Sequence, residues 1–139
     1  MSVFSEYQTD TIDLALDFYG YEDCPKNYEF GPSVRDNFVL HFVTKGKGVF
    51  HFNKKEIHLE AGDLFLLPKN KVTYYKADAE EPWSYYWIGI SGTKVSDFMR
   101  FSTLHEKGFL KKTEVETEKI GQFMERLVHK AEASKMTSH

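Results

Sequence analysis

The sequence has 139 residues, a length that fits one domain. A hydrophobic content of 41% and a charged content of 28% allow a buried core and a soluble surface, and an aromatic content of 16% favours strands over helices. The net charge of -3 and the pI of about 6.1 argue against a basic nucleic-acid-binding surface. The single cysteine, Cys24, has no partner for an internal disulfide. Because neither a signal-peptide pattern nor a bilayer-length apolar run is found, we expect a cytoplasmic protein without membrane contact.

The first thirty residues show no regular pattern, and residues 1–20 are expected to form an N-terminal arm. Within this stretch, residues 10–17 fit either a short strand or a helical turn. Proline fixes one backbone dihedral and glycine permits unusual ones, so Cys24-Pro25 and Gly31-Pro32 predict turns that lead into the main domain.

Short strands then follow in quick succession. The predicted strands are residues 38–44, 49–53, 56–59, 64–67, 71–77 and 82–90. Glycine-containing turns at residues 46–48 and 61–63, and Pro68, separate them. Such spacing predicts a sandwich or barrel over residues 21–92. Residues 64–67 are continuously apolar, which predicts a strand buried on both faces.

The hydrophobic period changes after Gly92. A short helix is predicted around Val95 and Met99, followed by a loop over residues 104–112 and a capping box at Thr113 and Glu116. A long amphipathic helix follows, with one apolar stripe. The stripe contains Ile120, Phe123, Met124, Leu127 and Val128. It fits packing on the chain's own barrel and a homodimer interface equally well, and residues 93–135 are therefore predicted to be a helical dimerisation region.

The strand at residues 82–90 carries both tryptophans. Strand geometry places Trp83, Tyr85 and Trp87 on one face, because alternate side chains point to opposite sides. Large flat rings with hydrogen-bonding tips suit a small ligand that is part apolar and part polar, such as a sugar. Core packing is an equally valid interpretation of each of the three rings.

The spacing of Gly48, Gly62-Asp63 and Pro68 resembles that of a cupin-like double-stranded barrel. Many cupins bind a metal through two histidines one residue apart, but His51 has Val49 and Asn53 at those positions. His41 and His51 facing each other across a hairpin would make a poor site without a carboxylate. We therefore expect no metal, no other cofactor and no catalytic residues.

The order of four segments resembles the N-terminal effector domain of AraC-type transcriptional regulators of sugar operons. These segments are residues 28–36 (YEFGPSVRD), 40–48 (LHFVTKGKG), 61–68 (AGDLFLLP) and 83–90 (WSYYWIGI). The resemblance covers about residues 10–135. It implies a metal-free cupin-like barrel (jelly roll) followed by a short helix and a long helix used for dimerisation. It also implies an arm that closes over the pocket, and DNA contact only through a C-terminal domain that this chain lacks.

The resemblance to the arabinose-responsive member of this family implies that the effector lies inside the barrel and that an aromatic ring at the position of Trp87 stacks on the sugar. Positions corresponding to Tyr75 and Tyr85 line the same pocket, although Tyr85 replaces a histidine there. The resulting hypothesis is an effector-sensing domain that binds a saccharide, with His41, Arg35 and His51 as further ligand contacts. For Arg35, an ion pair with a neighbouring aspartate is the alternative. A small cupin enzyme, such as a sugar isomerase or epimerase, and a lectin-like module are the competing functions.

Overall fold

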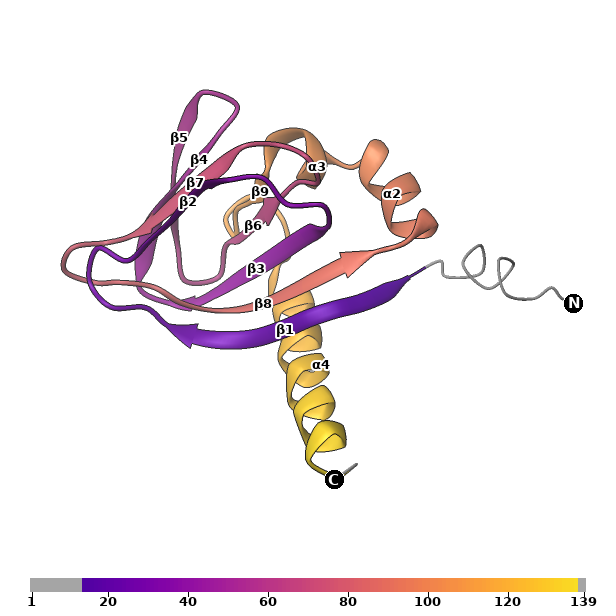
Figure 1. Ribbon diagram of the computed structural model, residues 1–139. Helices are drawn as coiled ribbons and strands as arrows, with labels where there is room; N and C mark the ends of the chain where they lie inside the picture. Colours follow the sequence, from indigo (N-terminus) through magenta and orange to yellow (C-terminus); the bar gives the residue numbers. More distant parts are fainter. Residues whose placement is uncertain (1–13, 138–139) are drawn as a thin grey trace, which may run out of the picture.

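The predicted strands form two facing antiparallel sheets in the computed structural model, which describes residues 14–137 (Figure 1). The first sheet contains, in spatial order, β1 (Ala15–Asp23), β8 (Ser84–Ser91), β3 (Phe38–Lys45), β6 (Leu64–Leu67) and β9 (Phe109–Leu110). The second contains β2 (Glu29–Ser33), β7 (Thr73–Ala77), β4 (Lys47–Phe52) and β5 (Lys55–Glu60). The predicted mainly β fold, a double-stranded barrel with C-terminal helices, is confirmed.

Alternation along the strands separates two hydrophobic cores. Val39 and Val43 of β3 point between the sheets, whereas Phe38 and Leu40 point to the outer face of the first sheet. The strand β6 contributes to both cores and all four of its residues are buried, as its continuous apolar run predicts. One core therefore fills the barrel, and the other joins the first sheet to the helices.

Three helices follow the barrel strands in the described part of the chain. They are α2 (Thr93–Arg100), α3 (Thr103–Lys107) and α4 (Glu118–Thr137). Helix α4 crosses the outer face of the first sheet beside β8 and β1, and its C-terminal part extends beyond the strands (Figure 1). None of the helices described here is long and apolar enough to span a bilayer.

The apolar stripe of α4 is divided between two environments. Met124 and Val128 are fully buried in the outer core, and Ile120 and Leu127 are partly buried against it. Phe123 is 55% exposed. Because the outer face of the sheet covers Met124 and Val128, these two residues pack within the chain and are not available to a second copy.

Two segments predicted to be irregular are regular in the structure. The first thirty residues contain β1 and part of β2, so residues 15–20 of the predicted arm belong to the first sheet. Of the rest of the arm prediction, Leu14 is described and exposed, and residues 1–13 lie outside the described residues. The predicted loop at residues 104–112 contains α3 and β9, and β9 adds an edge to β6. The hydroxyl oxygen of Ser102 accepts from the backbone N–H of His105 and begins α3, and Gly108, with φ of 86°, ends it.

The predicted capping box at Thr113 and Glu116 is wrong, because α4 begins at Glu118. Thr117, which precedes the helix, is buried and its hydroxyl donates to the carbonyl oxygen of Gly62 at 2.6 Å. This tertiary contact fixes the helix start on the turn between β5 and β6, which a local pattern cannot reveal.

Candidate functional site

A cavity of about 200 Å³ lies between the two sheets, at the end of the barrel lined by β1 and β2. Five of the six predicted ligand contacts line it: Arg35, His41, Tyr75, Tyr85 and Trp87. They come from β3, β7 and β8 and from the segment between β2 and β3. The structure thus brings residues separated by up to 52 positions to one cavity, whereas their role in binding stays a prediction.

The sixth predicted contact, His51, does not reach this cavity. Strand alternation turns Phe50 of β4 into the inner core, so His51 points outward and packs beside Tyr74, with 5.1 Å between ring centroids. His41 and His51 also belong to different sheets, so they do not face each other across a hairpin. His51 lies instead beside a shallow depression on the outer face of the second sheet.

The sequence did not predict the residues that complete the cavity wall. They are Phe18 and Glu22 from β1, Tyr28 and Phe30 from the β2 region, and Val39 and Leu67 from β3 and β6. Sequence inspection places β1 in an irregular arm, so its contribution could not be found by strand alternation.

Cross-strand rows of inward side chains build the wall between β1 and β8. One row runs from Gly20 through Trp87 and His41 to Phe65, and a Cβ atom added at Gly20 would overlap the indole ring of Trp87. In the next row Phe18 pairs with Gly89, and its ring covers the position where a Cβ of residue 89 would stand. Each ring therefore lies over a glycine on the neighbouring strand, which lets both rings lie close to the sheet.

His41 is the most deeply buried polar side chain of the cavity, with 2% of its surface exposed. Its ring stacks on Phe65 at 4.2 Å between centroids with 7° between planes. Burial lowers the pKa of the imidazole from 6.5 to about 3. Its Nδ1 atom is buried and has no hydrogen-bond partner among residues 14–137. The structure thus presents a neutral imidazole with an unused hydrogen-bonding atom.

Two tyrosine hydroxyls meet beside His41. The hydroxyl oxygens of Tyr75 and Tyr85 lie 3.2 Å apart, and the geometry allows either to donate. Burial raises the pKa of both phenols. Burial also raises the pKa of the neighbouring Cys24 thiol to about 11, which makes this cysteine a poor nucleophile. These groups are therefore hydrogen-bonding residues in their neutral forms.

Two oppositely charged side chains, Glu22 and Arg35, complete the polar part of the cavity. The guanidinium carbon of Arg35 lies 5.0 Å from the ring centroid of Phe18 and 5.9 Å from that of Phe30. In the described range, Arg35 forms no ion pair with an aspartate; the carboxylate of Asp63 instead accepts two backbone N–H bonds. Cation–π contacts hold the guanidinium while leaving its N–H groups able to bind a ligand.

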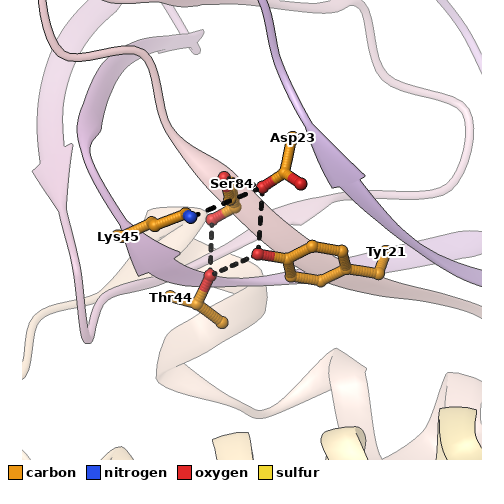
Figure 2. Close-up of polar contacts among 5 residues, drawn as sticks. All are labelled: Tyr21, Asp23, Thr44, Lys45 and Ser84. Atoms are coloured by element: carbon orange, nitrogen blue, oxygen red, sulfur yellow. Dashed lines mark hydrogen bonds and ion pairs between the residues drawn. The ribbon is translucent and has the colours of Figure 1, made fainter.

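A polar cluster fixes the end of β1 that carries Glu22. Figure 2 shows its members, which are Tyr21, Asp23, Thr44, Lys45 and Ser84. The hydroxyl of Ser84 donates to Asp23, whose carboxylate also accepts from the hydroxyl of Tyr21 at 3.1 Å. The hydrogen bond from Ser84 is the main cause that lowers the pKa of Asp23. The cluster joins β1 to β8 and β3, and so positions the adjacent Glu22 at the cavity.

Metal-ligating side chains do not gather in the described residues: no three His, Cys, Asp or Glu side chains there lie close enough to share an ion. In the cavity itself, His41 and Glu22 are the only residues of these types among the lining side chains. The arrangement suits recognition of a small molecule by ring stacking and hydrogen bonds.

Comparison with known proteins gives a consistent result. The chain matches the AraC-like ligand binding domain over residues 15–138. It is 44% identical over 107 residues to the Msm operon regulatory protein of Streptococcus mutans, covering 77% of this chain and 38% of that protein. It is 40% identical over 100 residues to the raffinose operon transcriptional regulatory protein of Pediococcus pentosaceus, covering 70% and 36%. For the lactose operon transcription activator of Staphylococcus xylosus, the identity is 34% over 97 residues, covering 70% and 35%.

The chain therefore spans less than two-fifths of the length of these relatives. Among solved structures, the cupin domain of Schizosaccharomyces pombe Cnp3 superimposes with a TM-score of 0.50 and 15% identity, covering 65% of this chain and 64% of that one. This likeness supports the cupin-like fold.

Proposed function

We propose that this chain, which belongs to the family of AraC-like ligand-binding domains, senses an effector by binding a saccharide in the cavity between its two sheets. The family match confirms the resemblance read from the sequence. The observation that carries the saccharide proposal is the combination of the Trp87 ring with the buried Nδ1 atom of His41, which has no hydrogen-bond partner among the described residues. The named relatives regulate raffinose and lactose operons, which is in keeping with this ligand class.

The proposed binding mode follows from the side chains. The indole of Trp87 offers an apolar face for the C–H groups of a sugar ring, and Arg35 and Glu22 offer paired donors and acceptors for its hydroxyls. The hydroxyls of Tyr75 and Tyr85 and the Nδ1 atom of His41 lie deeper. Neutral hydrogen-bonding groups at depth favour an uncharged, hydroxyl-rich ligand.

A binding function is favoured over an isomerase or epimerase by the titration of the same groups. Burial lowers the pKa of His41 to about 3, which leaves little imidazolium to act as an acid near neutral pH, and burial raises the pKa of Tyr75 and Tyr85, which leaves little phenolate to act as a base. The relatives are also named as operon regulators. We therefore propose that the cavity recognises its ligand without converting it.

Titration with sugars tests this function. D-galactose, D-glucose, D-fructose, lactose and raffinose would be added to the purified chain while calorimetry and melting temperature are followed. Trp87→Ala is expected to weaken binding at least tenfold, which is about 1.4 kcal/mol. Tyr86→Phe is the matched control, because Tyr86 is the next residue of β8 but faces the helical layer. Absence of binding to every sugar would contradict the saccharide proposal.

The wider role involves parts outside this chain. Because the relatives are longer, we propose that a C-terminal region beyond the chain contacts DNA, that the protein acts in the cytoplasm, and that this domain dimerises. Exposed rings on α2 and α4, Phe98 at 67% and Phe123 at 55% exposure, are the side chains best placed to meet a second copy. Light scattering tests the dimer: Phe123→Glu is expected to yield monomers, and a monomeric parent chain at high concentration would contradict it.

A further inference from the structure

In the cross-strand row of the first sheet that contains Trp87, two neighbouring rings lean away from each other. The row runs from Gly20 of β1 to Trp87 of β8, His41 of β3 and Phe65 of β6. The nearest ring atoms to a Cβ built at Gly20 are Cη2 and Cζ2 of Trp87, so the indole leans toward β1. The ring of His41 lies flat against Phe65, so it leans toward β6. The two neighbouring rings therefore diverge, and both line the cavity that opens between the sheets.

Gly20 lets the Trp87 ring lean away from His41 because it has no side chain, and not because of its backbone conformation. It is buried, and its backbone lies outside the left-handed region, so alanine is compatible with the local φ. The added methyl group would occupy the space of the indole, and Trp87 would have to move away from β1. His41 is the next side chain of the row, held by Phe65 behind it, so the displaced indole would enter the space between Trp87 and His41.

The size of the cavity indicates what this space accepts. Its volume of about 200 Å³ lies below the roughly 300–1,000 Å³ that is typical of sites for drug-sized ligands. We infer that the space between Trp87 and His41 receives one sugar ring, and that Gly20 is the positioning residue that keeps this space open, because it lets the indole of Trp87 lie against β1. The inference rests on the saccharide function proposed above, and any further sugar units of an oligosaccharide extend outside the cavity.

The position of the indole is measured first, without any ligand. The protein has two tryptophans, so their indole N–H signals can be followed separately by ¹H–¹⁵N NMR. Gly20→Ala is expected to shift the signal of Trp87 and to leave that of Trp83, which is buried beside Phe65 and Gly48, nearly unchanged. Gly121→Ala is the matched control, because its Cβ would overlap the ring of Phe42 on the outer face of the sheet. An unchanged Trp87 signal in Gly20→Ala overturns the inference.

Binding is measured next with D-galactose, D-glucose, D-fructose, lactose and raffinose. Gly20→Ala is expected to weaken the binding of whichever of these sugars the parent chain binds by at least tenfold, whereas Gly121→Ala changes affinity less than threefold. The double mutant Gly20→Ala/Trp87→Phe separates an effect on the position of residue 87 from a general loss of structure. Because the phenyl ring is smaller than the indole, Gly20→Ala is expected to reduce the sugar affinity less in the Trp87→Phe background than in the parent.

The outcomes distinguish this inference from the proposed function. If a sugar binds the parent chain and Gly20→Ala binds it equally well, the saccharide function stands and the role of Gly20 is refuted. If lactose or raffinose binds at least tenfold more tightly than each of its component monosaccharides, the limit of one ring is refuted. If no sugar binds the parent chain, the proposed function fails, and the one-ring assignment fails with it, whereas the NMR measurement still decides whether Gly20 positions Trp87.

Discussion

The burial of His41 predicts a specific loss of stability in mild acid. The folded protein holds this imidazole neutral, with a pKa of about 3, whereas in the unfolded chain it titrates near its ordinary value of 6.5. A histidine with a lowered pKa in the folded state contributes stability that is fully present above pH 6.5. This contribution is lost as the pH falls from 6.5 toward 3, because only the unfolded chain then gains the proton.

The magnitude follows from the same two values. At about 1.36 kcal/mol per pK unit, the difference between 6.5 and about 3 corresponds to roughly 5 kcal/mol in full, of which about 2 kcal/mol is already lost at pH 5. The carboxylates titrate mostly below pH 5, but the sequence has five further histidines, so the contribution of His41 is measured between pH 8 and pH 5 as the difference between the parent and a variant without this imidazole.

Urea unfolding at pH 8, 7, 6 and 5 measures this loss. His41→Phe keeps a planar ring against Phe65 and removes the titrating group, so its free energy of unfolding is expected to change little across this interval. His58→Gln is the control, because His58 is exposed on β5 and its replacement is expected to leave the parent's pH dependence in place. If His41→Phe lost stability between pH 8 and pH 5 as steeply as the parent, the reasoning from burial would be refuted.

Three further predictions concern the packing of the fold, each measured by urea unfolding at pH 8. Met124→Ala is expected to cost about 2–5 kcal/mol because Met124 is fully buried. Phe123→Ala, on the exposed side of α4, is expected to cost about 0.5 kcal/mol or less when unfolding is measured at a protein concentration at which the chain is monomeric, so that a dimer contact of Phe123 does not contribute. Equal costs would contradict the division of the stripe into buried and exposed residues. Asp63→Asn is expected to cost about 1.5–3 kcal/mol, since its carboxylate accepts two backbone N–H bonds at 2.8 and 2.9 Å, and an unchanged stability would show that these bonds contribute nothing. Gly48→Ala is expected to cost about 1–3 kcal/mol, because its Cβ would stand 2.6 Å from the ring of Trp83; a neutral effect would mean that this ring moves freely.

The barrel could be predicted because most of its strands carry their own signal. In β8 the inward rings Tyr85 and Trp87 alternate with the outward Tyr86 and Ile88, so both the strand and its two faces follow from the sequence. In β4 the strand was predicted, but His51 was expected to contact the ligand and faces outward instead. Both faces carry bulky residues, with Phe50 and Phe52 on one and Val49 and His51 on the other, so alternation alone does not indicate which face is inside.

The helix start shows a different limit of sequence reasoning. Thr113 and Glu116 have the spacing of a capping box, which would begin the helix at Glu114. The chain forms a turn there instead, and α4 begins at Glu118, four residues later. Thr117 is tied to Gly62, a contact across 55 positions, and this bond decides where the helix can begin. A local pattern predicted that a helix follows, and a tertiary contact determined its first residue.

The wall of the cavity is the part that no local signal could give. The inward positions of β1 are Phe18, Gly20 and Glu22. Only the first of these is a large apolar residue, since the second has no side chain and the third is charged, so β1 shows no alternation of apolar and polar residues. A glycine inside a strand normally weakens it, because it adds conformational freedom and offers nothing to pack. At Gly20 the indole of Trp87 supplies the missing packing from a strand 67 positions away, and the glycine in turn lets that indole lie against the sheet. The packing of Gly20 and Trp87 is therefore mutual, and it depends on the register in which β1 pairs with β8. A change that shifts this register by one residue would remove Glu22 from the cavity and place Tyr19 or Tyr21 against Trp87, so the recognition surface depends on the same hydrogen bonds that close the sheet.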